Sequence, residues 1–185
     1  MATHGLSGRV AALAASSEHC FSKQTRATIV IRAGLGVEGD AHSGTRVQHL
    51  SRIKADPAKP NLRQVHLIHA ELLNELSEAG YSLRSGDLGE NILTEGIDLL
   101  ELPRGALLHI GDQVELEVTG LRNPCGQIEA FQSGLLSQLV MKACNGRIVR
   151  KAGIMTVARV GGIINCGDAI SVALPEGEHQ PLEVV

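Results

Sequence analysis

The chain has 185 residues, which suits one domain, and 43% of them are hydrophobic, enough to build a sizeable core. Charged residues make up 20% and the formal net charge is -3, so the chain has no general attraction for nucleic acids or anionic membranes. Aromatic residues make up only 2%, which excludes a surface built for stacking bases. We therefore expect no nucleic-acid or membrane partner.

No apolar run approaches the roughly 20 residues that span a bilayer. The apolar stretch at residues 10–15 is too short for a secretion signal and favours a strand. The four cysteines are widely spaced and show no pattern of a disulfide framework or a zinc site: Cys20, Cys125, Cys144 and Cys166. We therefore expect a reduced, cytoplasmic protein with free thiols.

The first third of the chain combines strands with loops. Residues 7–17 and 27–32 are predicted to be strands, the second because of its β-branched run. A glycine-rich loop at 34–40 and a long polar loop at 43–61 complete this part. Long loops in compact domains often carry function.

The clearest helix is predicted at residues 69–79, directly after a short alternating strand at 64–68. Leu72 and Leu76 lie on its apolar face, and Gly80 is typical of a helix end. The residues from Gly80 to position 120 are mostly strands and turns in this interpretation.

The second half continues the alternation of strands and turns. Glycine-aspartate pairs at 111–112 and 167–168 each predict a tight turn that leads into a strand. A second helix is predicted at 132–143 from its apolar spacing. Strands are predicted at 154–160 and 163–174.

Many short strands, frequent turns and two helices predict a mainly β fold. We expect a β-barrel of mostly antiparallel strands with a few short helices. The domain is predicted to span residues 7–174, and the polar segment 175–185 is predicted to be a flexible C-terminal tail.

The sequence around Cys125 has the composition of a reactive site. A strand leads to Gly120, and Pro124 stops the ladder because it lacks a backbone N–H. Residues 127–131 can open a helical turn whose N–H groups, together with Arg122, favour the thiolate form. A lone cysteine is more often a small buried apolar residue, so local chemistry leaves both interpretations open.

A second polar cluster lies at residues 85–92. It combines glycines, which allow a backbone to approach a ligand closely, with Asp87, Glu90 and Asn91. The alternative is an acidic tight turn, which composition alone favours.

Two further clusters have the residue types of binding sites. Asp40 and His42 lie two positions apart, on one side of an extended segment, and can form an Asp–His pair or bind a metal. Arg147, Arg150 and Lys151 form a basic group that suits a phosphate. A solvated surface turn is the alternative for the basic group.

Taken in chain order, these segments resemble the MOSC domain family, named after the C-terminal part of molybdenum cofactor sulfurases. The resemblance covers residues 7–174 and looks like the short bacterial stand-alone members. Its landmarks are Gly39-Asp40 with His42, Arg63-Gln64-Val65, Gly86-Asp87-Leu88-Gly89-Glu90-Asn91, Leu102-Pro103, Gly111-Asp112, Val118-Thr119-Gly120, Arg122-Asn123-Pro124-Cys125 and Lys151-Ala152-Gly153-Ile154-Met155.

The resemblance implies an antiparallel β-barrel and a cysteine, here Cys125, that carries sulfur as a persulfide or binds molybdenum directly. A soft thiolate suits both roles. The resemblance also implies a molybdopterin ligand, whose phosphate suits the basic group. The candidate cofactor-binding residues are Asp40, His42, Asp87, Gly89, Glu90, Asn91, Arg122, Asn123, Arg147, Arg150 and Lys151.

The chain departs from the full sulfurases, which carry a pyridoxal-phosphate desulfurase domain and a further β domain. It is too short for either, so we expect no bound pyridoxal phosphate and a separate partner, a cysteine desulfurase or an electron-transfer protein. A homodimer is permitted. Three hypotheses stay open: a molybdenum-cofactor enzyme or binding module, a persulfide carrier without metal, and a non-catalytic β-barrel interaction module.

Overall fold

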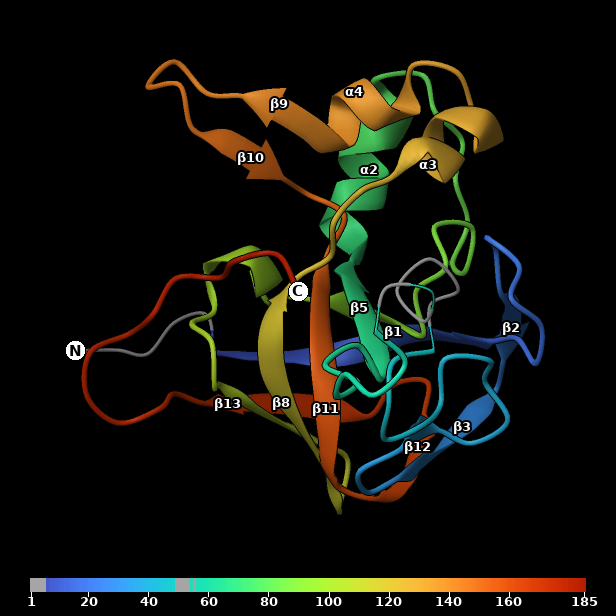
Figure 1. Ribbon diagram of the computed structural model, residues 1–185, viewed down its shortest axis with the longest axis vertical. Helices are drawn as coiled ribbons and strands as arrows, with labels where there is room; N and C mark the ends of the chain where they lie inside the picture. Colours follow the sequence, from blue (N-terminus) through green and yellow to red (C-terminus); the bar gives the residue numbers. More distant parts are fainter. Residues whose placement is uncertain (1–5, 49–53, 55) are drawn as a thin grey trace.

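The computed structural model describes residues 6–48, 54 and 56–185 (Figure 1). Its centre is a closed barrel of seven strands in the order β13-β7-β8-β11-β5-β6-β1, closed by pairing of β1 with β13. All neighbours in this barrel are antiparallel except β5 and β6, which are parallel. The barrel strands are β1 (Ser7–Ala15), β5 (Val65–His69), β6 (Ile92–Glu95), β7 (Leu107–Ile110), β8 (Val114–Leu121), β11 (Ile154–Val160) and β13 (Ala169–Ala173). The predicted mainly β barrel with a few short helices is confirmed.

Alternating side chains fill the barrel, because successive residues of a strand point to opposite faces. In β8, Val114, Leu116 and Val118 are buried while the residues between them are partly exposed. Leu13 of β1 and Leu67 of β5 join the same core. Aliphatic residues build this core, in keeping with the 2% of aromatic residues in the chain.

One helix makes the crossover between the two parallel strands. Helix α2 (Ala70–Glu78) follows β5 directly and buries Leu72 and Leu76, four positions apart on one face. The chain turns at Gly80, which has φ +91°, a backbone conformation that favours glycine. The helix predicted at residues 69–79 is therefore confirmed. No helix in the described part of the chain has the length and apolar character needed to span a bilayer.

A small layer covers one end of the barrel (Figure 1). It contains α2, α3 (Gly126–Phe131), α4 (Leu135–Leu139) and a hairpin of β9 (Val140–Lys142) and β10 (Ile148–Arg150). A second apolar cluster, which includes Ile68, Leu88, Ile128 and Leu139, lies beneath these elements.

The predicted helix at residues 132–143 is wrong at both ends. Gly134, with φ +81°, starts the helix late, and α4 has only five residues. Residues 140–142 leave it to pair with residues 148–150 around the turn at Gly146. Pairing across the hairpin thus prevails over a local apolar spacing that fits a helix.

Smaller elements complete the fold. Strand β2 (Gln24–Arg26) extends the main sheet beside β1. Strands β12 (Gly162–Asn165), β3 (Thr28–Arg32) and β4 (Gly36–Val37) form a separate sheet. A 3-10 turn, η1 (Leu99–Glu101), precedes β7. Most of the loop predicted at 43–61 is described, but residues 49–53 and 55 lie outside the described part.

The C-terminal segment runs along the end of β8. The backbone N–H of Leu121 donates to the carbonyl of Glu183 at 2.7 Å, and the N–H of Val185 donates to the carbonyl of Leu121 at 3.3 Å. The N–H of Arg104 donates to the carbonyl of Gln180 at 2.9 Å. These bonds place residues 180–185 against the barrel, while the mobility expected of 175–185 stays a prediction.

Candidate functional site

Cys125 lies in the short connection between strand β8 and helix α3. Strand β8 ends at Leu121, and the chain passes through buried Pro124 before α3 begins at Gly126. Cys125 is the residue before the helix, with extended backbone angles, and its thiol donates to Oε1 of Gln127 at 3.5 Å. The side chain is half-buried. The strand exit and helical turn predicted around this cysteine are therefore both present.

The side chain of Cys125 lines a pocket of about 190 Å³, which we call the Cys125 pocket. The loop before β2, the loop around His42, β5, the segment before β6, the β8–α3 connection and β11 all contribute to it. Its lining residues are Cys20, Phe21, Lys23, His42, Arg63, His66, Gly89, Asn91, Arg122, Asn123, Cys125, Gln127 and Met155. Three of these carry a cationic side chain and none carries a carboxylate, although the whole chain has a net charge of -3.

Arg122 is the most unusual of these cations. It is only 8% exposed, and its Nη1 atom is buried with no hydrogen-bond partner among the described residues. Its guanidinium lies over the ring of Phe21, 5.8 Å from the ring centroid. Burial lowers the pKa of Arg122, and the nearby Cys125 and Glu90 act in the opposite direction. A guanidinium stays protonated under such shifts, so a positive charge lies beside the thiol.

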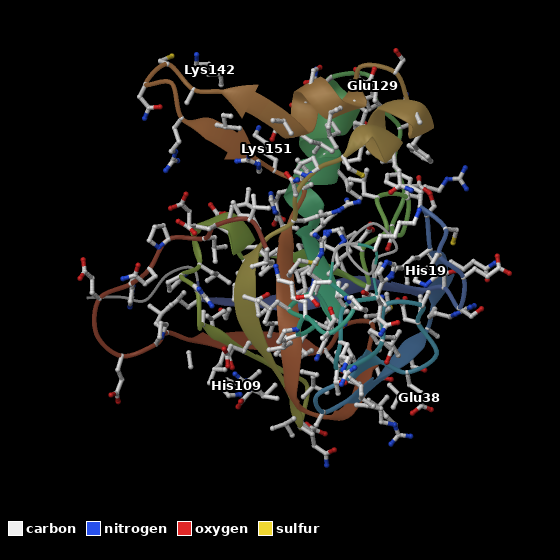
Figure 2. All side chains as sticks on the ribbon, viewed as in Figure 1. His19, Glu38, His109, Glu129, Lys142 and Lys151 are labelled. Atoms are coloured by element: carbon white, nitrogen blue, oxygen red, sulfur yellow. The ribbon has the colours of Figure 1, made fainter. Side chains whose placement is uncertain are left out.

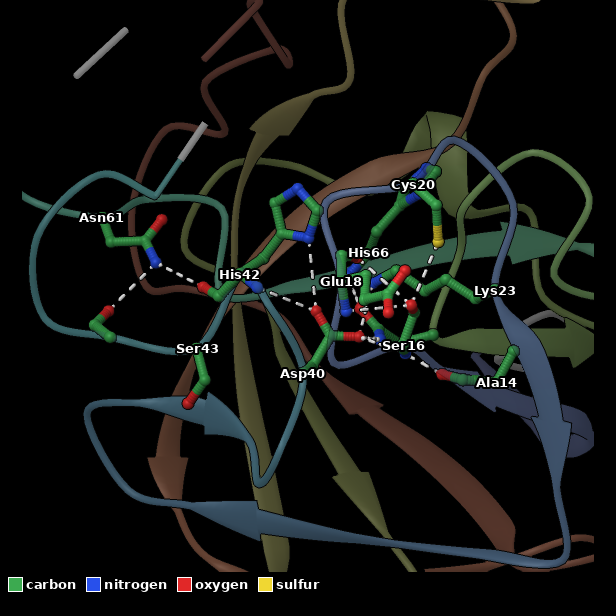
Figure 3. Close-up of polar contacts among 12 residues, drawn as sticks. Ala14, Ser16, Glu18, Cys20, Lys23, Asp40, His42, Ser43, Asn61 and His66 are labelled. Carbon is green, nitrogen blue, oxygen red and sulfur yellow. Dashed lines mark hydrogen bonds and ion pairs between the residues drawn. The ribbon is translucent and has the colours of Figure 1, made fainter. Parts of the chain in front are cut away.

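Asp40 does not line the pocket itself but contacts three residues that do, Lys23, His42 and Asn91, and accepts several hydrogen bonds (Figure 3). Its carboxylate accepts from Lys23 Nζ at 2.8 Å, from Asn91 Nδ2 at 3.0 Å and from the backbone N–H of Ser16 at 3.2 Å. Burial alone would raise the pKa of Asp40, but the hydrogen bonds from His42 and the charge of Lys23 hold it well below its usual range. Asp40 is thus an anion that fixes the surrounding side chains.

The predicted Asp–His pair is present beside the pocket. His42 donates its backbone N–H to Oδ1 of Asp40 at 3.0 Å, and its Nδ1 lies 3.2 Å from the same oxygen (Figure 3). A carboxylate only accepts, so Nδ1 is the protonated nitrogen and Nε2 is left to face the pocket. The ring of His19 meets that of His42 edge to face, with centroids 5.4 Å apart.

His66 lies on β5 and is buried. Its Nε2 donates to the carbonyl of Ala152 at 2.8 Å, because a carbonyl can only accept. Burial and the charge of Arg122 hold the pKa of His66 well below its usual value. His66 is therefore a neutral side chain in the lining of the pocket.

The Gly89 segment approaches the pocket through its backbone. Gly89 has φ +80°, and a Cβ at this position would lie 2.6 Å from the carbonyl oxygen of Phe21. Only glycine fits both constraints. Asn91 follows and links three parts of the site, since it bonds to Asp40, to the carbonyl of Ala14 at 3.2 Å and to the backbone N–H of His66 at 3.2 Å.

Two acidic candidates lie behind the pocket. Glu90 accepts from the backbone N–H of Gly86, and its Oε2 has no partner among the described residues. Burial raises the pKa of Glu90. Asp87 accepts from the backbone N–H of Arg84 at 2.8 Å, as in an ordinary tight turn. Neither side chain lines the Cys125 pocket.

The structure does not bring the basic group to Cys125. Arg147 and Arg150 line a separate cavity of about 590 Å³ between β10 and the C-terminal segment. Lys151 forms an ion pair with Glu75 of α2 and lies beside β10 in Figure 2. Their assignment as phosphate anchors stays a prediction without support from the Cys125 pocket.

Sequence reasoning missed four functional candidates in the pocket: Cys20, Lys23, Arg63 and His66. Arg63 alone had a signal, as part of the Arg63-Gln64-Val65 landmark. Lys23 lies in a polar stretch before an exposed edge strand, so nothing local indicated its burial at 8% exposure. No group of three or more His, Cys, Asp or Glu residues within the described ranges has the geometry of a metal site.

The fold and this pocket together define a small barrel protein whose pocket is lined by two cysteines, Cys20 and Cys125. The MOSC domain profile matches residues 58–171, and the chain belongs to the MOSC domain family. This family is associated with molybdenum cofactor and sulfur chemistry. A search of curated proteins gave no match.

Solved structures share the fold. The YUAD protein from Bacillus subtilis is similar with a TM-score of 0.75 and 23% identity, over 92% of this chain and 97% of that one. YiiM from Geobacillus stearothermophilus has a TM-score of 0.61 and 14% identity, over 90% and 75% of the two chains. YiiM from Escherichia coli has a TM-score of 0.59 and 16% identity, over 93% and 73%. At these identities the likeness concerns the fold.

Proposed function

We propose that this chain binds the molybdenum cofactor in its Cys125 pocket, with the Cys125 thiolate as a ligand of molybdenum. The observation that carries this proposal is a half-buried thiol in a pocket lined by three cations and no carboxylate. A soft thiolate suits molybdenum, and cations suit an anionic, phosphate-bearing ligand. The bound cofactor would supply either a redox centre or a terminal sulfur to be exchanged.

The donor set of the pocket fits such a ligand. Arg122 offers an unpartnered N–H, and Asn123 and Gln127 offer amide groups of the kind that bind a polar ring. The volume is smaller than the about 300–1,000 Å³ typical of sites that enclose a whole organic ligand. Arg63 also lines a neighbouring cavity of about 370 Å³, which gives a large ligand room beyond the pocket.

The residues around the pocket have distinct tasks in this proposal. Arg122 neutralises ligand charge, while Lys23 is already matched by Asp40 and Arg63 donates to the carbonyl of Val185. Asp40 also orients His42, so that its Nε2 can hold or accept a proton at the pocket wall. His66 stays neutral and contributes no charge.

The test is the molybdenum content of protein purified from a host that makes the cofactor. Wild type is expected to contain near-stoichiometric molybdenum by elemental mass spectrometry, and Cys125→Ala is expected to contain none. Cys144→Ala is the matched control, because Cys144 is exposed and lies outside the pocket. Metal-free wild type would refute cofactor binding under these conditions, and equal metal in Cys125→Ala would refute the ligand role.

A second candidate function is a persulfide carrier without bound metal. It is favoured by the small size of the pocket and by the partial exposure of the thiol, which a donor must reach. The donor would be a separate cysteine desulfurase. Intact mass is expected to show one added sulfur atom on Cys125 that thiols remove, and its absence would leave a non-catalytic interaction module.

The cellular setting follows from the same thiols. All four cysteines of the chain are described and free, and three of them are exposed. Either proposed role needs a reduced Cys125, so we propose a cytoplasmic location, with a sulfur or electron donor as protein partner.

A further inference from the structure

The Cys125 pocket has a charge opposite to that of the chain. Lys23, Arg63 and Arg122 line it without any carboxylate, whereas the chain as a whole has a net charge of -3. A concave surface lined by one sign of charge concentrates ions of the other sign. Lys23 is already matched by Asp40 and Arg63 donates to the carbonyl of Val185, so Arg122 is the cation beside Cys125 on which an anion site depends.

One buried N–H group of a lining residue lacks a hydrogen-bond acceptor, which an anion would supply. Nη1 of Arg122 is buried and has no hydrogen-bond partner among the described residues. The charge of Glu90 acts on Arg122, but no ion pair joins the two among the described residues. One Glu90 oxygen accepts from the backbone N–H of Gly86, and the other has no partner in the described part of the chain. An unsatisfied buried N–H of a charged group is costly, and an oxyanion in the pocket would satisfy it.

The size of the pocket selects among anions. Its volume of about 190 Å³ holds a small ion completely but is below the about 300–1,000 Å³ of sites for larger ligands. A thiolate beside an anion site is suited to a substrate that combines an electrophilic sulfur with a negatively charged leaving group.

We propose that Cys125 takes sulfur directly from a small sulfane-sulfur oxyanion of the thiosulfate class, with Arg122 as the residue that binds its sulfonate oxygens. This inference rests on the persulfide-carrier role and names a donor for it. The chain would then be a sulfurtransferase that can be loaded without a protein donor.

The chemistry balances without an added oxidant. The Cys125 thiol releases its proton to water, and the thiolate attacks the outer sulfur of thiosulfate. A new S–S bond forms at Cys125, the sulfur–sulfur bond of thiosulfate breaks, and its electron pair leaves with sulfite. Arg122 stabilises the charge that grows on the sulfite oxygens. A low-molecular-weight thiol then accepts the outer sulfur as its own persulfide and returns the Cys125 thiolate.

The first experiment uses full-length protein made in a host without molybdenum cofactor. With thiosulfate, wild type is expected to gain one sulfur atom at Cys125 by intact mass and to release an equal amount of sulfite. Cys125→Ser is expected to do neither. Loading by a cysteine desulfurase but not by thiosulfate would overturn this inference and leave the carrier role intact, whereas loading by neither would refute the carrier role itself.

The second experiment isolates Arg122. The variant Arg122→Gln is expected to lower kcat/KM for thiosulfate about tenfold or more, the factor for losing a hydrogen bond to a charged group. Arg26→Gln is the matched control, because Arg26 is exposed on β2 and does not line the pocket. Unchanged thiosulfate kinetics in a folded Arg122→Gln variant would overturn the assignment.

Two alkylating reagents of similar size but different charge provide a readout independent of sulfur transfer. The rate of Cys125 alkylation by anionic iodoacetate relative to neutral iodoacetamide is expected to fall in Arg122→Gln and to stay unchanged in Arg26→Gln. Should Arg122→Gln fail to fold, sulfite is expected to protect wild-type Cys125 from iodoacetamide. Equal rates with and without sulfite would overturn the proposed anion site.

Discussion

Replacing Asp40 by Asn is expected to destabilise the protein by about 3–5 kcal/mol, the usual result of removing one partner of a buried ion pair. Asp40 and Lys23 lie 2.8 Å apart, and their side chains are only 1% and 3% exposed, so water does not screen them. Asn keeps the size of Asp but leaves the Lys23 ammonium buried without a counter-charge. It also weakens the acceptor for the backbone N–H groups of Ser16 and His42.

This change is large against the about 5–15 kcal/mol of a typical domain. At about 2–4 °C per kcal/mol for a chain of this size, Tm is expected to fall by roughly 6–20 °C. Urea unfolding followed by far-UV circular dichroism measures it, since the chain has no Trp and one Tyr to report by fluorescence. Glu117→Gln is the control, because its ion pair with Arg159 is partly exposed and contributes at most about 1 kcal/mol.

The double variant Lys23→Met/Asp40→Asn tests the cause. It removes the unmatched cation, so it is expected to be more stable than Asp40→Asn alone. The reasoning is refuted by a loss below about 1 kcal/mol in Asp40→Asn, the range of an exposed pair. It is equally refuted by a double variant that is no more stable than the single one.

Three other perturbations test other parts of the molecule. Glu90→Gln keeps the size of a buried side chain but removes a negative charge near Arg122, so sulfite is expected to bind several-fold more tightly by calorimetry; unchanged affinity would contradict the anion site. Burial and the charge of Arg122 lower the pKa of His66, so the unfolded chain binds a proton that the folded chain does not, and stability is expected to fall as pH drops below about 6.5. The free energy of unfolding, measured with urea, is expected to depend less on pH between neutral and mildly acidic conditions in His66→Gln than in wild type. The same pH dependence in both proteins would exclude His66 as its cause. Gly153→Ala is expected to cost about 2–6 kcal/mol, from about 1–3 for a left-handed backbone at φ +87° and about 1–3 for overpacking, because a Cβ would lie 2.1 Å from a carbonyl oxygen of β5. Gly177→Ala has a similar φ of +82° but open space around it, so a loss as large as that of Gly153→Ala would contradict the steric argument.

Local patterns predicted the barrel well where a strand alternates between buried and partly exposed residues, as in β8. The burial of Val114, Leu116 and Val118 is readable from the sequence alone. The parallel pairing of β5 with β6 cannot be read from the sequence in this way, since it depends on how the intervening helix α2 packs against the barrel. The helix predicted at 132–143 failed for the same reason, because hairpin pairing of β9 with β10 is a contact that no local window contains.

The sequence indicated part of the candidate site, but not the buried charges beside it. The sequence singled out Asp40, His42 and Cys125, and the structure places all three at one pocket or directly beneath it. It gave no sign that Lys23 is buried, since an amine in a polar stretch is normally solvated. The resemblance also made Arg147, Arg150 and Lys151 candidate phosphate anchors, because a charge cluster in the sequence does not reveal which way its hairpin faces.

Buried charges cost free energy of folding, so their presence beside this pocket is an argument for a role in binding a ligand. Replacing a buried ion pair by apolar residues of similar size is often neutral or stabilising, so stability alone does not account for Lys23 and Asp40. The unpartnered N–H of Arg122 costs a further amount of about 1–3 kcal/mol. An anion that satisfies this N–H binds only the folded chain, and at a hundredfold excess over Kd it adds about 2.7 kcal/mol of stability. The same atom that weakens the ligand-free barrel is therefore the one through which a bound anion stabilises it.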